Sequence, residues 1–190
     1  MRHVITIFLL LAAIMSMSCT RQPADGISGK VTKDTPEKAI VYYYLTQKDD
    51  QEASKNLTML DMHPYQGKIL VFYKYNGQYI FQWVESKNDG FVAQYGRTAV
   101  SSSADADNPI DIVGTSAASE TNTYSAAGIY VKSPEIYGVA LVFSNGETIN
   151  KYITEESGFS VFSEEYVELK QVVAYDKNNN EVWSSSSPLN

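Results

Sequence analysis

The feature that most constrains the fold is an Asn-Gly pair between two alternating runs. Asn76 and Gly77 join residues 69–75 (ILVFYKY) to residues 78–84 (QYIFQWV). Such a pair indicates a two-residue type I′ turn, because both turn positions need a positive φ. The turn fixes the hairpin register. We therefore expect four facing pairs: Tyr75 with Gln78, Lys74 with Tyr79, Phe72 with Phe81, and Leu70 with Trp83.

Each face of this hairpin then has a defined set of side chains, because side chains alternate along a strand. One face holds four apolar residues that we expect in the core: Leu70, Phe72, Phe81 and Trp83. The opposite face is half polar: Val71, Tyr75, Gln78 and Gln82. A second turn over residues 87–90 (KNDG) returns the chain through residues 91–95, which gives a three-stranded antiparallel meander.

One short helix is expected before these strands. Thr35 is a suitable N-cap, Pro36 suits the first turn, and Glu37 favours the positive end of the helix dipole. The next residues, 39–45, are apolar almost all round. At helical spacing, three of them share a face that we expect to pack across a sheet rather than to form an aromatic ligand cage: Ile40, Tyr43 and Tyr44.

Residues 101–123 are small and polar apart from an apolar stretch at 110–113. This composition indicates a long, surface-exposed and mobile connection between two halves. Beyond it, alternation and turn residues predict further strands at 128–131, 139–144, 147–153, 159–162, 167–175 and 181–183.

The sequence therefore predicts a mainly β, α+β fold. Antiparallel meanders and hairpins should form two packed β-units, or a sandwich, with one short N-terminal helix. The first unit, with the helix, covers residues 35–100, and the second covers residues 124–190. Asn76-Gly77 in the first corresponds to Asn145-Gly146 in the second. A duplicated unit explains this correspondence, and so do two independent hairpins with the same turn chemistry.

The N-terminus has the composition of an export signal. A short polar start precedes an apolar run over residues 4–15, which is too short to span a bilayer, since a span needs about 20 residues. Ser16-Met17-Ser18-Cys19 follows, and Cys19 is the single cysteine of the chain. This segment resembles the lipobox of bacterial lipoproteins, in which the cysteine is lipidated and becomes the new N-terminus.

The resemblance implies a signal peptide over residues 1–18, lipidation of Cys19, and a tether over residues 19–34. Such lipoboxes usually have Leu where this chain has Ser16. The small residues Ser16 and Ser18 equally suit an ordinary signal peptidase, which would leave a secreted protein with a free N-terminal thiol. An acylated Cys19 would bind membrane lipid with enough acyl chain for stable attachment.

The general plan resembles small exported lipoproteins of Gram-positive-type bacteria. The resemblance rests on Cys19, the tether, the helix start at residues 35–39 and the segment at residues 173–176 (VAYD). It implies a lipid-anchored, extracytoplasmic location on a cell membrane, and no known activity. Thr20 after the cysteine would favour the outer membrane if the source has two membranes.

Composition excludes several classes of function. The 15 Lys and Arg residues stand against 22 Asp and Glu, the formal charge is −7, and no basic block is present, so we expect no nucleic-acid partner. A single cysteine excludes an intramolecular disulfide and any multi-cysteine metal site. We expect no metal and no cofactor.

Catalytic chemistry has little support in the sequence. His63 has a carboxylate two residues away, at Asp61, but no serine lies in a Gly-x-Ser-x-Gly frame, so we expect no catalytic role. Two acidic clusters are better explained as solvated turns than as calcium sites: Asp105, Asp107, Asn108 and Asp111 in one, and Asp176, Asn178 and Asn180 in the other.

Two classes of function remain. The first is a non-enzymatic domain that binds a protein, a peptide or an envelope component. It is supported by 14 tyrosines, whose amphipathic rings suit interfaces. Its possible binding surface comprises Tyr73, Tyr75, Tyr79 and Trp83. The alternative is a hydrolase that acts on envelope material through Asp and Glu residues, for which the sequence contains no motif.

Overall fold

The computed structural model describes residues 33–94, 99–101, 107–119, 122–153 and 158–186. Two helices precede the strands: α2 (Pro36–Gln47) and α3 (Ala53–Asn56). All strand pairs are antiparallel. Sheet A contains β1 (Leu57–Tyr65), β2 (Lys68–Tyr75), β3 (Gln78–Lys87), β4 (Gly90–Ala93) and β5 (Ala99–Ser101).

Two further sheets follow, and both interleave strands from different parts of the chain. Sheet B has the order β10-β7-β6, with β6 (Ile110–Ser119), β7 (Asn122–Val131) and β10 (Gly158–Ser163). Sheet C has the order β12-β11-β8-β9, with β8 (Gly138–Phe143), β9 (Thr148–Tyr152), β11 (Leu169–Tyr175) and β12 (Glu181–Ser186). The prediction of a mainly β, α+β fold with one N-terminal helix is confirmed.

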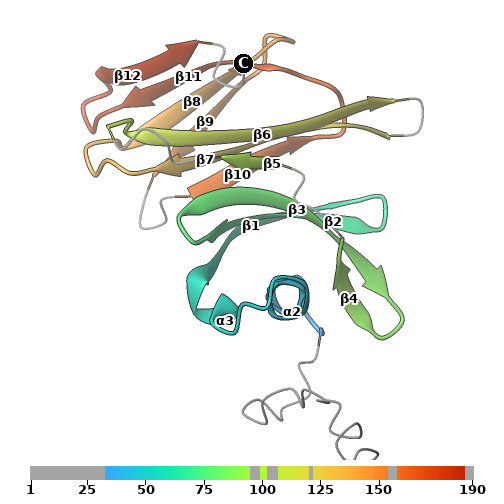
Figure 1. Cartoon of the computed structure of the whole chain (residues 1–190). Helices are drawn as coiled ribbons and strands as arrows, with labels where there is room; N and C mark the ends of the chain where they lie inside the picture. Colours follow the sequence, from blue (N-terminus) through green and yellow to red (C-terminus); the bar gives the residue numbers. More distant parts are fainter. Residues whose placement is uncertain (1–32, 95–98, 102–106, 120–121, 154–157, 187–190) are drawn as a thin grey trace, which may run out of the picture. The chain divides into compact units, whose positions relative to one another are not determined.

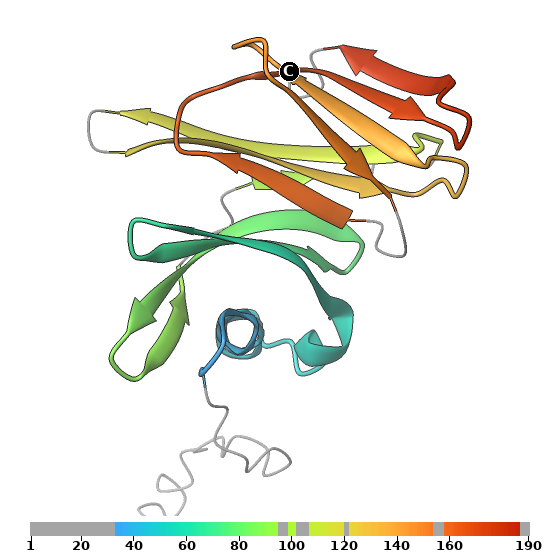
Figure 2. The same ribbon diagram turned by 180° about the vertical axis from the view of Figure 1, so that it is seen from behind.

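Three hydrophobic cores join four successive layers, which are the helices and sheets A, B and C (Figures 1 and 2). The first core lies between α2 and sheet A, the second between sheets A and B, and the third between sheets B and C. Sheets A and B are therefore each covered on both faces. This explains why their strands contain so many consecutive buried residues.

The helix begins as the sequence predicts. The Thr35 side chain accepts a hydrogen bond from the backbone N–H of Lys38, and Pro36 occupies the first turn. The buried face contains Ala39 together with the predicted set: Ile40, Tyr43 and Tyr44.

The register of the β2–β3 hairpin matches all four predicted pairs. Asn76 and Gly77 have φ values of 48° and 78°, as a type I′ turn requires. The predicted half-polar face is wrong, however, because α2 covers it. Val71 and Gln82 are fully buried there. Gln82 is held by two hydrogen bonds, accepting from the Tyr73 hydroxyl at 2.6 Å and donating to the Gln94 carbonyl at 2.8 Å.

The second Asn-Gly pair forms a different turn from the first. At Asn145-Gly146 only the glycine has a positive φ, and Phe143 pairs with Glu147 across a three-residue loop. The strands after the two hairpins also differ, since β4 pairs with the preceding strand β3 whereas β10 joins sheet B. These differences favour two independent hairpins over a duplicated unit.

The prediction of a mobile connection over residues 101–123 is wrong for most of these residues. Residues 110–119 form the ten-residue strand β6, which pairs with β7 along its whole length. Its small polar side chains predict a loop when they are considered alone. Pairing with β7 supplies the backbone hydrogen bonds that make the segment a strand.

Sheets A and B approach each other very closely at Gly128. A Cβ atom built on this residue would lie 2.5 Å from Cε2 of Phe72. Any larger residue would therefore collide with a fully buried ring of the β2–β3 hairpin. Gly128 marks the point where the two sheets interlock.

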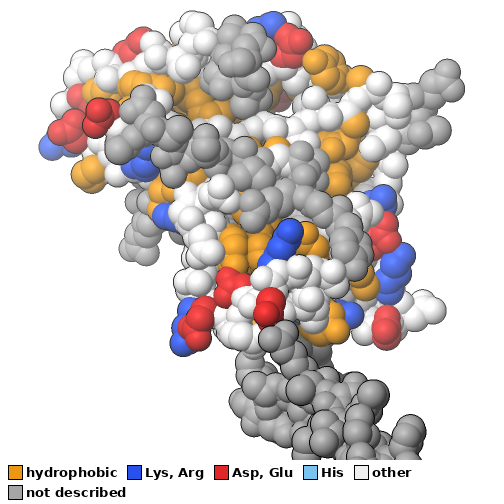
Figure 3. Space-filling view, viewed as in Figure 1, with side chains coloured by type: hydrophobic (Ala, Val, Ile, Leu, Met, Phe, Trp, Pro, Cys, Tyr) orange, Lys and Arg blue, Asp and Glu red, His pale blue; other side chains and the backbone are white. Residues whose placement is uncertain are grey.

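Surface charges are mixed rather than segregated. Figure 3 shows acidic and basic side chains beside one another on the face in view, with hydrophobic side chains reaching the surface between them. On β3, Glu85 is approached by two lysines, Lys87 at 2.5 Å and Lys68 at 3.5 Å. Exposed pairs of this kind contribute little to stability.

Candidate functional site

The aromatic surface expected from the sequence is not available for binding. Tyr73, Tyr75 and Tyr79 are each at most 5% exposed, and Trp83 is only half-buried. Tyr73 and Tyr75 lie under α2, where the Tyr75 ring stacks on Tyr44 with centroids 3.8 Å apart. Tyr79 and Trp83 face sheet B. The expectation is wrong because both faces of the hairpin are covered.

His63 lies in a polar cluster with Asp61 and a distant serine, Ser160. Nε2 of His63 is 2.7 Å from Oγ of Ser160 and 3.6 Å from Oδ2 of Asp61. The same Asp61 oxygen accepts from the Ser160 backbone N–H at 3.0 Å and from its hydroxyl at 3.1 Å. These bonds join β1 of sheet A to β10 of sheet B.

This cluster does not have the geometry of a catalytic triad. In a triad, Nε2 accepts the serine proton while Nδ1–H faces the carboxylate. Here a single nitrogen of His63 faces both partners. The Ser160 hydroxyl is also placed to donate to Asp61, and in that arrangement Nε2 of His63 donates to Oγ. Ser160 is also only 4% exposed, which leaves no path for a substrate to its hydroxyl. The cluster is a structural link between two sheets.

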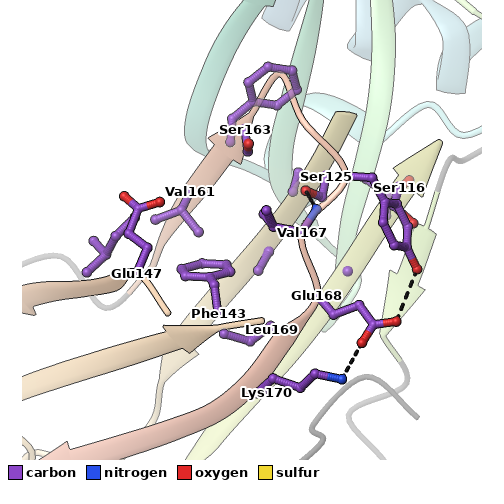
Figure 4. A pocket seen from close by; sticks show the side chains of 17 residues that line it. Ser116, Ser125, Phe143, Glu147, Val161, Ser163, Val167, Glu168, Leu169 and Lys170 are labelled. Atoms are coloured by element: carbon purple, nitrogen blue, oxygen red, sulfur yellow. Dashed lines mark hydrogen bonds and ion pairs between the residues drawn. The ribbon is translucent and has the colours of Figure 1, made fainter. Parts of the chain in front are cut away.

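A larger cavity lies elsewhere, between sheets B and C. It is a pocket of about 610 Å³ (Figure 4). Its apolar part includes Phe143, Val161 and Leu169, all of which are buried. Figure 4 shows Glu147 on one side of these residues and Glu168 with Lys170 on the other. The volume is in the range of small-molecule sites.

The pocket exists because of a gradient in side-chain size along sheet B. The side chains that face sheet C are large at one end of the sheet: Ile110, Ile112, Ile129, Val131 and Phe159. At the other end all but Val161 are small: Gly114, Ser116, Ser125, Ala127 and Ser163. The large residues fill the space between the sheets, and the small ones leave it open.

One wall of the pocket is the segment between β10 and β11, and Ser125 fixes its position. The Ser125 hydroxyl donates to the Glu165 carbonyl at 2.8 Å and accepts from the Val167 N–H at 3.0 Å. Ser125 is 8% exposed, so both bonds are largely shielded from water. This wall is therefore held in place by a residue of sheet B.

Two of the three charged groups at the rim, Glu168 and Lys170, pair with each other. Glu168 pairs with Lys170 and accepts from the Tyr166 hydroxyl at 3.3 Å. The hydrogen bond from Lys170 and its charge lower the pKa of Glu168. Glu168 is thus a stable carboxylate and a poor proton donor. On the opposite side, the backbone N–H of Glu147 donates to the Asn145 side chain at 3.0 Å.

The acidic segment that begins at Asp176 forms a turn, as the sequence predicts. Asp176 accepts from the backbone N–H groups of Asn178 and Asn180 at 2.7 and 2.9 Å, which forms a solvated turn.

Within the described ranges, no group of three or more His, Cys, Asp or Glu side chains is placed to hold a metal ion. Nor does any helix in that part of the chain have the length and apolar character to cross a membrane. The signal peptide, Cys19 and Asp105 lie outside the described residues.

No protein-family model, curated protein or solved structure matches this chain. The pocket must therefore be interpreted from its own geometry. Sequence reasoning did not identify its residues. Residues 114–119 (GTSAAS) are small at every position, so no alternation distinguishes the face toward the pocket.

The structural role of His63 predicts a specific pH dependence. Burial, the largest influence, lowers the pKa of His63 below its ordinary value of 6.5; nearby Asp61 opposes the shift and Lys151 adds to it. The unfolded chain therefore binds a proton more readily than the folded one. The stability that His63 contributes is complete above about pH 7 and falls as the pH drops through about 6.

We expect His63→Gln to flatten this slope, because glutamine is neutral at every pH and still offers an N–H donor to Ser160. The measurement is the free energy of unfolding by urea, between about pH 7.5 and 5.5, where few carboxyl groups titrate. The chain from Thr20 contains His63 as its single histidine. An equal slope in the variant would contradict the assignment.

Proposed function

We propose that this chain is a non-enzymatic, extracytoplasmic binding domain, held at a membrane by an acylated Cys19. Its ligand is the apolar part of a peptide or envelope component, which enters the pocket between sheets B and C. The observation that carries the binding role is the pocket itself. The anchor is supported by the lipobox-like segment at residues 16–19, which contains the single cysteine.

The pocket supports a binding role because it is an unfilled volume beside a well-packed core. Native interiors are close-packed, and open space lined by apolar side chains lowers stability. Here Phe143, Val161 and Leu169 line such a space, although large buried side chains pack together between the same two sheets at their other end. A ligand that covers these side chains recovers the lost contacts.

A binding role is favoured over hydrolysis because two polar groups of the pocket, Ser125 and Glu168, already have partners within the protein. Ser125 fixes the wall, and Glu168 is neutralised by Lys170. A hydrolase that uses two carboxyl groups needs one of them to act as a proton donor. The lowered pKa of Glu168 is the wrong direction for that role.

The pocket is tested with N-phenyl-1-naphthylamine, a neutral probe whose fluorescence rises in apolar surroundings. The polypeptide from Thr20 to Asn190 keeps the compact unit Thr32–Asn190 whole. We expect saturable binding at one site. Ser116 is exposed and lines the pocket, so Ser116→Trp should fill the mouth and weaken binding at least about ten-fold, a loss of about 1.4 kcal/mol.

Ser184→Trp is the matched control, because Ser184 is also an exposed serine on a strand but lies outside the pocket. This variant should bind the probe as the unmodified chain does. The proposal fails if the chain shows no saturable binding, or if Ser116→Trp binds as tightly as Ser184→Trp.

The anchor is tested in cells with an alkyne analogue of palmitate. We expect the unmodified chain to be labelled and to fractionate with membranes, and Cys19→Ala to lose both properties, because the thiol is the acylation site. Ser16→Leu is the control, since it restores the residue usual at that position of a lipobox and should be labelled at least as strongly. Undiminished membrane association of Cys19→Ala would refute the anchor.

A further inference from the structure

A second concave site lies at the end of sheet C where β8 begins. It is a shallow groove of about 180 Å³, lined by residues of β8, β9, the end of β11 and the turn after it. Gly138 pairs with Tyr152 on one side and with Tyr175 on the other. Paired residues point to the same face of a sheet, so two tyrosines flank a position that has no side chain.

Gly138 is not required by the backbone or by packing. Its φ is not positive, and an added Cβ would meet only ordinary contacts, 3.7 Å from the Lys151 carbonyl oxygen and 3.9 Å from the Tyr152 ring. Gly128 differs in this respect, since a Cβ there would strike Phe72 at 2.5 Å. A glycine inside a strand weakens it, and one without a structural reason often marks a close approach by a ligand.

The aromatic groups at this groove are unusually exposed. Tyr152 is 76% exposed and Tyr137 is 53% exposed. Their rings meet edge to face, with centroids 6.2 Å apart and planes at 61°. Tyr137 is fixed by its backbone on both sides, because its N–H donates to the Tyr175 carbonyl and its carbonyl accepts from Ile153. Two ring faces are thus presented to solvent by a rigid backbone.

The polar groups at the groove suit hydroxyl groups better than a charged ligand. Asn150 and Asn179 contribute amide groups, each with donors and an acceptor. Asp176 contributes a carboxylate. The side chain of Lys151 points to the opposite face of sheet C, because Lys151 pairs with Val139 and its charge acts on His63. Asp176 stays ionised, because its hydrogen bonds with Asn180 and Asn178 lower its pKa. The groove therefore offers apolar faces, amides and one carboxylate, which accepts hydrogen bonds from hydroxyl groups and repels anions.

We propose that this groove binds a neutral saccharide. A sugar ring has an apolar face of C–H groups, which packs on a tyrosine ring, and a rim of hydroxyls, which bond to amides. Gly138 leaves the floor open for that ring, between Tyr152 and Tyr175. The site is on the opposite face of sheet C from the pocket. Val139 and Leu141 point into the core shared with sheet B, and Gly138, one residue before Val139 on the same strand, therefore lies on the other face.

The test is a printed array of neutral oligosaccharides, probed with the full-length chain in a neutral detergent. We expect the unmodified chain to bind at least one of them. Gly138→Val should lower that signal at least about ten-fold, because its methyl groups occupy the floor of the groove. Valine is favoured in strands, so the melting temperature of this variant should not fall.

Tyr152→Ala provides a second variant, which removes a highly exposed ring, and it should lower the signal to the same extent. Tyr42→Ala is the control, because Tyr42 is an exposed tyrosine on α2, away from the groove. It should bind as the unmodified chain does. The proposal is overturned if the unmodified chain binds no neutral oligosaccharide. It is also overturned if either groove variant, with an unchanged melting temperature, binds as the control does.

Discussion

The rest of the structure depends on the burial of both faces of the β2–β3 hairpin. Val71 and Ile80 on one face, and Phe72 and Phe81 on the other, are completely inaccessible to water. A two-stranded hairpin is marginally stable alone, so layers on both sides are needed to exclude water from it. Helix α2 supplies one layer and sheet B supplies the other. The polar groups inside are compensated, as Gln82 is by Tyr73 and Gln94.

Sheet B lies between sheets A and C, and its two faces are packed to different extents. Toward sheet A it is closely packed, with Gly128 against Phe72 and Tyr124 against the edge of Trp83, ring centroids 5.2 Å apart. Toward sheet C it is packed at one end and open at the other, where Ser116 and Ala127 face the pocket. The pocket is therefore a consequence of side-chain size on one face of a sheet whose other face is fixed.

What could be predicted from the sequence was local. The turn at Asn76-Gly77, the register that follows from it and the Thr35 cap depend on residues close together in the chain, and all three are confirmed. The predictions that failed concern tertiary contacts. The half-polar face and the tyrosine surface are covered by α2 and sheet B, and no local pattern reveals such covering.

The candidate sites were beyond sequence reasoning for the same reason. His63 and Ser160 are 97 residues apart, and the pocket combines strands that are distant along the chain. The segment over residues 110–119 was misassigned because small polar side chains are common both in loops and in strands that face a cavity. Residues 114–119 (GTSAAS) are small at every position, so no alternation of side-chain type indicated a strand there.

The pocket explains how a fold with three well-packed cores can still offer a binding site. One of its walls is fixed by the shielded hydrogen bonds of Ser125, so the space between the sheets is formed without a ligand. An exported domain tethered through Cys19 would carry this preformed site to the membrane surface. Preformed sites bind with less ordering of the protein than sites that fold around a ligand.

The most direct test of this account compares two neighbouring residues of β7. Ala127 faces the pocket, and Gly128 faces Phe72 on the other side of the same sheet. The measurement is the free energy of unfolding in urea for Ala127→Leu and Gly128→Ala. The account predicts a change under about 1 kcal/mol for Ala127→Leu, although it adds three carbons, and a loss of about 1–3 kcal/mol or more for Gly128→Ala, which adds one. A larger loss for Ala127→Leu than for Gly128→Ala would show that the space between sheets B and C is filled, and would contradict the account.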